Sequence, residues 1–360
     1  MQVIESFFIR NKIDSDTIAV GVSGGADSLA LVLLLKEQLP QLSVIALTVD
    51  HGLRPTSHQE AEYVAEVMKK NGIEHHILVW EGEKPTVGVE EKARIARYNL
   101  LFEWCRKRGI KYLAIAHHLL DQAETFLMRL ERGSGLYGLS SMQEITEREG
   151  IKILRPLLTI HPDRLKDYLR YRHINWVEDE SNQCTEYLRV KMRQFLPIME
   201  EYTGISAKRI CLAASNLLST RKFIEASVEE IIDKKVHFFE NCGCSVDFSE
   251  FMSWHNELKF YVVIRLIELI NKNEYMPEAS SLRGMIDNIK GKDFNSTTLG
   301  GIYFLKSELK LWLIKEYRDI NDCNSKEEWQ IYEKENPIVR GVFIPAKLRQ
   351  ALLIEKNHKK

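Results

Sequence analysis

A glycine loop between an apolar segment and a helix is the feature that most restricts how this chain can fold. Residues 17–22 are apolar enough for a buried strand, and residues 29–37 combine apolar side chains with good helix formers. Between them lies a loop of six residues, Ser23, Gly24, Gly25, Ala26, Asp27 and Ser28. Strands and helices continue to alternate to about residue 132. Repeated strand–helix units of this length predict an α/β fold, with a parallel sheet covered on both faces.

The same periodicities place the other elements of this region. Further strands are expected at 43–49, 73–79 and 111–116, and helices at 57–72, 89–108, 120–132 and 161–173. Ser57 and Glu60 have the spacing of a capping box at the start of one of these helices. Residues 174–177 could form one more strand.

The second half of the chain has a different pattern. From about residue 185 it is helical as far as about residue 291, and short strands return near 295–315. We therefore expect two domains, a nucleotide-binding α/β domain at 1–205 and a mainly helical domain at 206–360.

Three polar segments, at 23–28, 50–54 and 117–124, each follow a predicted strand directly. Ligands of open parallel sheets bind outside the carboxyl ends of the strands. We therefore expect the three segments to form one site.

The first segment has the chemistry of a phosphate-binding loop. Its two glycines let the backbone approach a phosphate, and the start of the next helix adds N–H groups and positive potential. The hydroxyls of Ser23 and Ser28 can donate hydrogen bonds to phosphate oxygens. Because Asp27 would repel a bare phosphate, we expect Mg²⁺ beside it. A plain glycine turn with Asp27 as a helix cap is the alternative.

The other two segments supply ionisable groups. Asp50 begins the segment Asp-His-Gly-Leu-Arg, which could bind a nucleotide or form only a solvated turn. Asp121 and Glu124 are three residues apart, so they share one face of the predicted helix. Two carboxylates there could hold an ammonium group, and His117 with Asp121 could instead hold a metal. An acid-rich first turn, favoured by the helix dipole, is the simpler alternative.

Composition excludes some classes of protein. The chain has 50 basic and 51 acidic side chains, so any contact with nucleic acid must come from local patches. It has no apolar run of roughly 18 residues, so we expect a cytoplasmic protein with no membrane partner. Six scattered cysteines are expected to be reduced thiols; Cys242 and Cys244 lack the second close pair that a zinc site needs.

The order of the motifs resembles one family of the ATP pyrophosphatase (PP-loop) superfamily, the tRNA(Ile)-lysidine synthetases. The family motifs S-G-G-x-D-S, D-H-G-L-R, A-R-x-x-R-Y, A-H-H-x-x-D-Q-x-E-T and R-G-S-G-L-x-G-L match residues 23–28, 50–54, 93–98, 116–125 and 132–139. Weaker matches lie at 155–158, 179–182, 187–193 and 298–301. The match is strong over residues 17–200 and weak beyond.

The resemblance implies an activity. Members of this family use ATP to adenylate the C2 oxygen of cytidine 34 in the isoleucine tRNA with a CAU anticodon. The amine of free L-lysine then displaces AMP. The second domain is expected to bind the tRNA body, and a homodimer is an open alternative for the assembly.

The resemblance also implies roles for single residues. Residues 23–28 and Asp50 would hold ATP, with Mg²⁺ near Asp27. Asp121 and Glu124 would grip or deprotonate the lysine, and His117 and Arg97 would line the nucleotide or the cytidine. The arginines expected to face tRNA phosphates are Arg129, Arg132, Arg189 and Arg193.

Three positions depart from the family pattern, and two other functions remain open. Leu120 stands where many relatives have an acid, Val190 where asparagine is usual, and Glu180 where proline is common. One alternative is a PP-loop enzyme that thiolates a tRNA base, although the chain has no C-x-x-C pair. The other is a non-catalytic relative that binds ATP and RNA.

Overall fold

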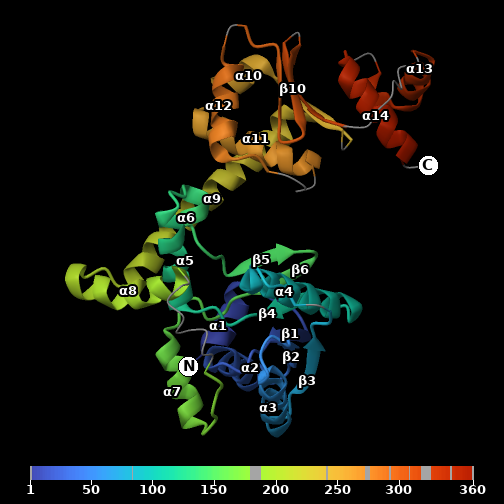
Figure 1. Ribbon diagram of the computed structural model, residues 1–360. Helices are drawn as coiled ribbons and strands as arrows, with labels where there is room; N and C mark the ends of the chain where they lie inside the picture. Colours follow the sequence, from blue (N-terminus) through green and yellow to red (C-terminus); the bar gives the residue numbers. More distant parts are fainter. Residues whose placement is uncertain are drawn as a thin grey trace. The chain divides into compact units, whose positions relative to one another are not determined.

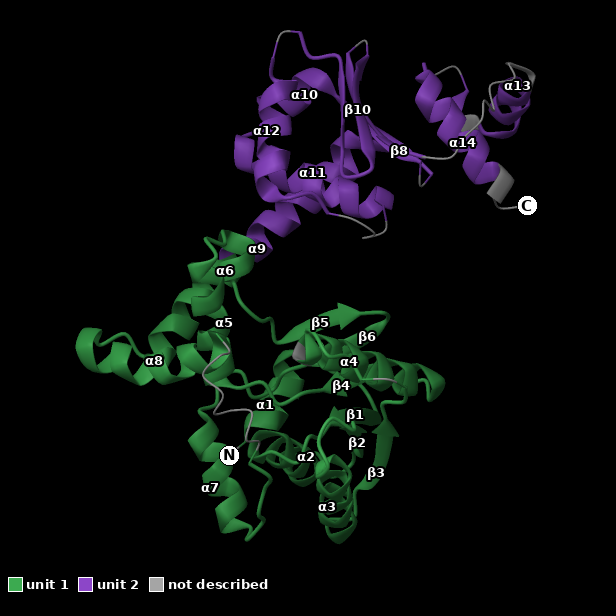
Figure 2. Ribbon diagram, viewed as in Figure 1, with its two compact units in different colours: residues 1–219 green, residues 220–360 purple. Residues whose placement is uncertain are grey.

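The chain divides into two units within a single long helix. The structure, a computed structural model, describes residues 2–82, 84–178, 188–240, 242–271, 276–291, 293–307, 309–317, 326–340 and 343–358. The units are residues 1–219 and 220–360 (Figure 2), and the division falls inside α9 (Ala207–Lys235). The sequence-based boundary at 205 stays a prediction, and each unit is described by itself.

A six-stranded sheet organises the first unit (Figure 1). Its strands are β1 (Thr17–Gly21), β2 (Ser43–Asp50), β3 (Glu74–Val79), β4 (Tyr112–Ala114), β5 (Ile145–Arg148) and β6 (Ile151–Leu154). They lie in the order β3-β2-β1-β4-β6-β5. All neighbours are parallel except β5, which is antiparallel to β6. The predicted parallel sheet is thus confirmed, with β1 between β2 and β4.

Helices cover both faces of this sheet, with α1 (Val3–Arg10), α2 (Ala26–Gln38), α3 (Ser57–Lys70) and α7 (Pro162–Tyr171) on one face and α4 (Val89–Lys107) on the other. α5 (Leu119–Glu131) follows β4 and contacts α6 (Leu136–Leu139) and α8 (Leu188–Thr203). Ile18 and Val20 of β1 pack in one core with α1, α2, α3 and α7. Ala19 between them packs in the other core, with Tyr98 and Phe102 of α4. Successive side chains of a strand point to opposite faces, so a strand buried on both faces is a continuous apolar run.

Two local predictions for this unit are wrong. The N-cap of α3 is Thr56, without a side-chain cap bond, and Ser57 is already helical. The Ser57 hydroxyl instead accepts from the backbone N–H of Arg54, so it is not available for a capping box. Residues 174–177 form no strand, because the sheet ends at β3 and β5 and this segment pairs with neither. Within this segment, the backbone N–H of Val177 donates a hydrogen bond to the Gly24 carbonyl (3.0 Å).

An antiparallel sheet lies in the second unit. Its strands are β7 (Val236–Phe239), β8 (Gly243–Asp247), β9 (Ser296–Leu299), β10 (Ile302–Ser307) and β11 (Lys310–Lys315), in the order β7-β8-β11-β10-β9. The strands expected near 295–315 are confirmed. The uninterrupted helical pattern as far as residue 291 is wrong, because β7 and β8 interrupt it. Residues 243–246 are all buried, so β8 lacks the alternation that would mark a strand with one exposed face.

Helices complete the second unit. They are the end of α9, α10 (Phe248–Ser253), α11 (Asn256–Asn271), α12 (Ala279–Ile289), α13 (Lys326–Glu335), a 3₁₀ turn at Pro337–Val339 and α14 (Ala346–His358). Phe239 of β7 and Trp312 of β11 (ring centroids 5.6 Å apart) share a core with Leu348 and Leu352 of α14. Among the described parts of both units, no helix has the length and apolar character that crossing a membrane requires.

Gly243 provides a test of how tightly β8 packs on β11. A Cβ atom added at Gly243 would lie 2.4 Å from the carbonyl oxygen of Leu313 and 3.1 Å from the Cα of Ile314, and neither backbone atom can turn aside. We expect Gly243→Ala to lower the free energy of unfolding by about 1–3 kcal/mol in urea denaturation of the full chain. Gly284→Ala in α12 is the matched control. Its Cβ would meet nothing within 4 Å, so it should stabilise by about 0.5–1 kcal/mol. Equal stabilities of the two variants would contradict this packing.

Candidate active site

The three predicted polar segments follow three neighbouring strands. β2, β1 and β4 run in the same direction, so the segments after them lie along one edge of the sheet. A direct contact joins the first and third segments: Nε2 of His118 lies 3.5 Å from Oδ2 of Asp27. The topology and this contact bring the loop at 23–28 and the start of α5 into one site.

The loop at 23–28 holds its shape through its own serines and one glycine. The Ser28 hydroxyl donates to the Gly25 carbonyl (2.9 Å) and accepts from the Ser23 N–H (3.1 Å). Gly24 has φ +86°, and a Cβ there would lie 3.2 Å from Val64, so only glycine fits without strain. Gly25 is the N-cap of α2 and makes no side-chain cap bond. The first N–H groups of any helix lack intrahelical acceptors, and a phosphate oxygen could accept from them here.

Asp27 has the environment of a ligand for a cation. Its Oδ1 is buried and has no hydrogen-bond partner among the described residues. Burial raises the pKa of Asp27, and His118 only partly opposes this. Mg²⁺ is commonly held by one or two carboxylates together with substrate phosphates. The single carboxylate of Asp27 is compatible with a site of this kind. Within the described ranges, no group of three or more His, Cys, Asp or Glu side chains is placed to hold a metal. The alternative metal site at His117 and Asp121 stays a prediction.

His118 caps α5, a role that the motif analysis did not assign. Its Nδ1 accepts from the Asp121 N–H (3.3 Å), and the Asp121 carboxylate accepts from the His118 N–H (3.0 Å). Because Nδ1 is the acceptor, a neutral ring carries its proton on Nε2, facing Asp27. The His-x-x-Asp spacing matches that of a capping box, and this signal could have identified the role from the sequence.

Asp121 and Glu124 lie with Arg189 and Arg193 of α8 in one ion-pair cluster. Glu124 is fully buried, and its two oxygens accept from Nε of Arg189 (2.8 Å) and Nε of Arg193 (2.6 Å). Arg189 also donates to Asp121 (3.2 Å). The structure thus joins two acids expected to hold lysine to two arginines expected to face RNA. Both roles stay predictions.

Charges within this cluster and its surroundings shift two pKa values. Burial alone would raise the pKa of Asp121, but His118 and Arg189 outweigh it and hold that pKa below its usual range. Burial opposes the charge of Arg193, yet the hydrogen bond to Glu124 raises its pKa. Its surroundings thus shift the pKa of Asp121 in the opposite direction to that of Asp27.

The segment after β2 is also bonded locally. Oδ1 of Asp50 accepts from the Gly52 N–H (2.9 Å), and its Oδ2 lies 3.3 Å from Nδ1 of His58. Burial, and next Arg97, lower the pKa of His51. Arg97 is half-buried, and this partial burial lowers its pKa; its guanidinium lies 5.3 Å from the centre of the Tyr98 ring. That Asp50 and Arg97 contact a nucleotide stays a prediction.

The remaining predicted residues differ in how they are placed. Arg129 donates to the Gly138 carbonyl (2.7 Å), which holds the loop after α5 against that helix. Arg132 is the exposed C-cap of α5. Leu120 and Val190 are half-buried. Glu180, with the motif at 179–182, lies outside the described residues.

The described cysteines have no feature of a reactive or metal-binding group. Burial raises the pKa of Cys105 to about 12 and that of Cys211 to about 11. A reactive cysteine needs a lowered thiol pKa, so these two thiols are unsuited to sulfur transfer. Cys184 and Cys323 lie outside the described residues.

Comparisons with known proteins show the family of the chain. Residues 2–199 match the family model described as the PP-loop domain, so the first unit is a PP-loop domain. A tRNA(Ile)-lysidine synthase of Wolbachia sp. subsp. Brugia malayi is 35% identical over 340 residues, 91% of this chain and 77% of the relative. Another, of Wolbachia pipientis wMel, is 37% identical over 86% of this chain and 72% of its own length. The chain belongs to the tRNA(Ile)-lysidine synthase family.

A solved structure shares the fold. It is a U34-tRNA thiolase from Methanococcus maripaludis, with a TM-score of 0.52, 21% sequence identity, and coverage of 61% of this chain and 77% of that one. At this identity the likeness concerns the fold alone.

Glu124→Gln tests the ion-pair cluster. The variant keeps the shape of the side chain but leaves Arg189 and Arg193 without the buried charge that both contact. Because these arginines are partly exposed and water can reach them, we expect a loss of about 1–3 kcal/mol of unfolding free energy in urea denaturation. Glu131→Gln, at the exposed end of the same helix, should change it by less than about 0.5 kcal/mol. Equal effects would show that the cluster does not hold α5 and α8 together.

His117 should contribute to the pH dependence of stability. Burial lowers its pKa to about 3, whereas an unfolded histidine titrates near 6.5. The stability from a neutral buried imidazole is present above pH 6.5 and is lost as the pH falls toward the folded pKa. Between pH 7 and pH 5 the wild type should therefore lose up to about 2 kcal/mol more unfolding free energy than His117→Gln. Identical pH dependence in urea denaturation would mean that the folded structure does not lower the pKa of His117.

Proposed function

We propose that this chain is an ATP-dependent ligase that joins L-lysine to C2 of cytidine 34 in the isoleucine tRNA with a CAU anticodon, releasing AMP and pyrophosphate. One observation carries the proposal. A phosphate-binding loop touches, through Asp27 and His118, a helix whose carboxylates already bind cationic nitrogen donors. Membership of the tRNA(Ile)-lysidine synthase family supports the choice of substrates.

The first step needs ATP held by its phosphates. The cytidine C2 oxygen attacks the α-phosphorus, the bond from that phosphorus to the bridging oxygen breaks, and pyrophosphate leaves. The amides at the start of α2 would bind phosphate oxygens and keep them in place. Asp27 would hold Mg²⁺, which would neutralise charge on the leaving pyrophosphate. Arg97 and His117 would line the nucleotide or the cytidine.

The second step needs a lysine amine that has lost its extra proton. The amine attacks C2, the bond from C2 to the adenylate oxygen breaks, and AMP leaves. Asp121 is better suited to binding the lysine than to deprotonating it, because a base works best with a pKa near the working pH, and that of Asp121 is lowered. Glu124 is fully buried and already bonded to both arginines, so it would act mainly by orienting them.

The tRNA is proposed to contact Arg129, Arg132, Arg189 and Arg193. Arg132 is exposed, and the side chains of Arg189 and Arg193 remain 39% and 38% exposed beside Glu124. Parts of these guanidinium groups can thus reach phosphates while Nε stays with Glu124.

The test is transfer of labelled lysine to a transcript of the isoleucine tRNA, with ATP and Mg²⁺. We expect label in RNA, with AMP formed in equal amount, only when position 34 is cytidine. Asp27→Asn and Asp121→Asn keep the size of each side chain but remove its charge, and each should lower the rate at least about 100-fold. Glu131→Gln should retain the wild-type rate.

The variants should separate the two steps. Asp121→Asn should still consume ATP when tRNA is present, with a raised KM for lysine, whereas Asp27→Asn should lose both steps. Release of orthophosphate in place of pyrophosphate would overturn the proposed function. A fully active Asp121→Asn would overturn the lysine assignment alone.

A further inference from the structure

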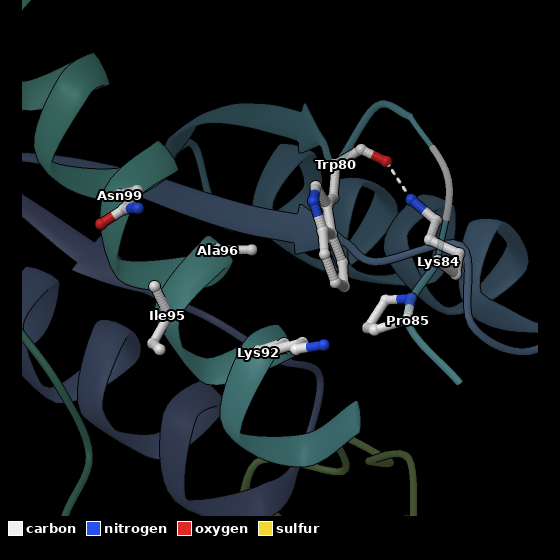
Figure 3. A pocket seen from close by; sticks show the side chains of 7 residues that line it. All are labelled: Trp80, Lys84, Pro85, Lys92, Ile95, Ala96 and Asn99. Atoms are coloured by element: carbon white, nitrogen blue, oxygen red, sulfur yellow. Dashed lines mark hydrogen bonds between the residues drawn. The ribbon is translucent and has the colours of Figure 1, made fainter. Parts of the chain in front are cut away.

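A pocket of about 450 Å³ lies where β3 ends (Figure 3). Only some of the residues that line it belong to a predicted motif. Trp80 and Lys84 come from the segment after β3. The facing side chains come from α4, and those used below are Lys92, Ile95, Ala96 and Asn99.

The pocket adjoins the candidate active site. The backbone N–H of Trp80 donates to the Asp50 carbonyl (2.9 Å), and the His51 ring meets the Trp80 ring edge-on, with the ring centroids 6.0 Å apart. Lys84 lies close to Gly52: a Cβ atom added at Gly52 would be 3.5 Å from the Cε of Lys84. β3 is the second strand from β1, so the pocket is about 10 Å along the same edge of the sheet from the phosphate loop.

The pocket combines an aromatic face with positive charge. The ammonium of Lys84 donates to the Trp80 carbonyl and lies 4.5 Å from the centre of the Trp80 ring. In Figure 3 the indole stands between Lys84 on one side and Ala96 and Asn99 on the other. Trp80 is half-buried and therefore held in place, while Lys92 and Asn99 are exposed. Among the described residues that line the pocket, none is acidic.

These features are those that bind unpaired nucleotides. Proteins recognise single-stranded RNA by stacking bases on aromatic rings, by amide hydrogen bonds to base edges, and by cations near the phosphates. An apolar ligand would make no use of the ammonium of Lys92 or the amide of Asn99. A phosphate alone would not need the indole.

We propose that this pocket binds one unpaired base of the RNA substrate, next to the nucleotide that enters the active site. The proposal rests on the proposed function. The base stacks on the indole of Trp80 beside Ala96, the amide of Asn99 hydrogen-bonds to the base edge, and Lys92 faces the adjoining phosphate. The adenine of ATP has the same chemistry, so the experiment must separate the two sources.

The experiment measures binding of a fluorescent anticodon stem-loop RNA to the full chain without ATP. Trp80→Ala should weaken binding about 5- to 150-fold, the loss typical of one stacked base, and Trp80→Phe should retain most of the affinity. RNA with an abasic nucleotide on one side of the target cytidine should bind the wild type more weakly by a similar factor. Trp80→Ala should bind this abasic RNA as tightly as the wild type does. The affinity of Trp80→Ala for ATP should equal that of the wild type.

Lys92 and Lys107 form a matched pair on α4. Lys107 lies at the far end of the helix, is 74% exposed and pairs with Glu103. Lys92→Gln should reduce the slope of log affinity against log salt by about 0.7, the value for one contact with a single-stranded phosphate. Lys107→Gln should leave the slope unchanged. Equal slopes for the two variants would exclude a phosphate contact at Lys92.

Other outcomes are also decisive. If Trp80→Ala fails to fold by circular dichroism, Trp80→Leu replaces it, because leucine keeps apolar volume without an aromatic face. Unchanged RNA affinity in the folded variant overturns the proposal. So does a fall in ATP affinity with unchanged RNA affinity, which would assign the pocket to ATP. If Trp80→Ala transfers lysine normally at RNA concentrations below the wild-type Kd, this proposal fails alone, whereas RNA binding that depends on Trp80 without any lysine transfer leaves it standing and overturns the proposed function.

Discussion

The parallel pairing of β1 with β2 on one side and β4 on the other determines where the polar groups of the first unit lie. Val20 is paired with Ala46 and with Ala114, so the three strands are in register up to the points where their loops begin. The loop at 23–28, the segment at 50–54 and the start of α5 are separated by 20 residues or more in the sequence. They lie along one edge of the sheet because neighbouring parallel strands end there. The buried apolar residues of β1 thus support the chemistry indirectly, by fixing the positions of these ends.

Burial and charge give the two central aspartates opposite properties. Asp27 has a buried oxygen with no hydrogen-bond partner among the described residues, and its pKa is raised, whereas Asp121 is surrounded by donors and its pKa is lowered. His118 lies between them, bonded to Asp121 and 3.5 Å from Asp27. Neighbouring carboxylates whose pKa values are pushed apart commonly have different roles. The roles proposed here, a cation ligand and an amine-binding anion, follow this difference.

The sequence was most informative where local patterns decide the structure. Apolar runs located β1, β2 and β3, and the glycine loop located the start of α2 within a few residues. The pattern could not show that Arg189 and Arg193 pair with Glu124, because such contacts join residues more than 60 positions apart. Nor could it show β8, whose side chains are buried on both faces. At α3 the spacing of Ser57 and Glu60 was misleading, because the helix begins one residue earlier than a capping box requires.

The cluster of Asp121, Glu124, Arg189 and Arg193 carries two negative and two positive charges, and so is electrically balanced. A lysine ammonium that enters it adds a third cation to a partly dehydrated space. Balance would be restored if one guanidinium turned outward, and an outward guanidinium would be available to an RNA phosphate. Under the proposed function, the affinities for amino acid and tRNA would then be thermodynamically linked. Each ligand would raise the affinity of the protein for the other by the same factor. An enzyme built in this way would hold its amino acid poorly until the nucleic acid has arrived.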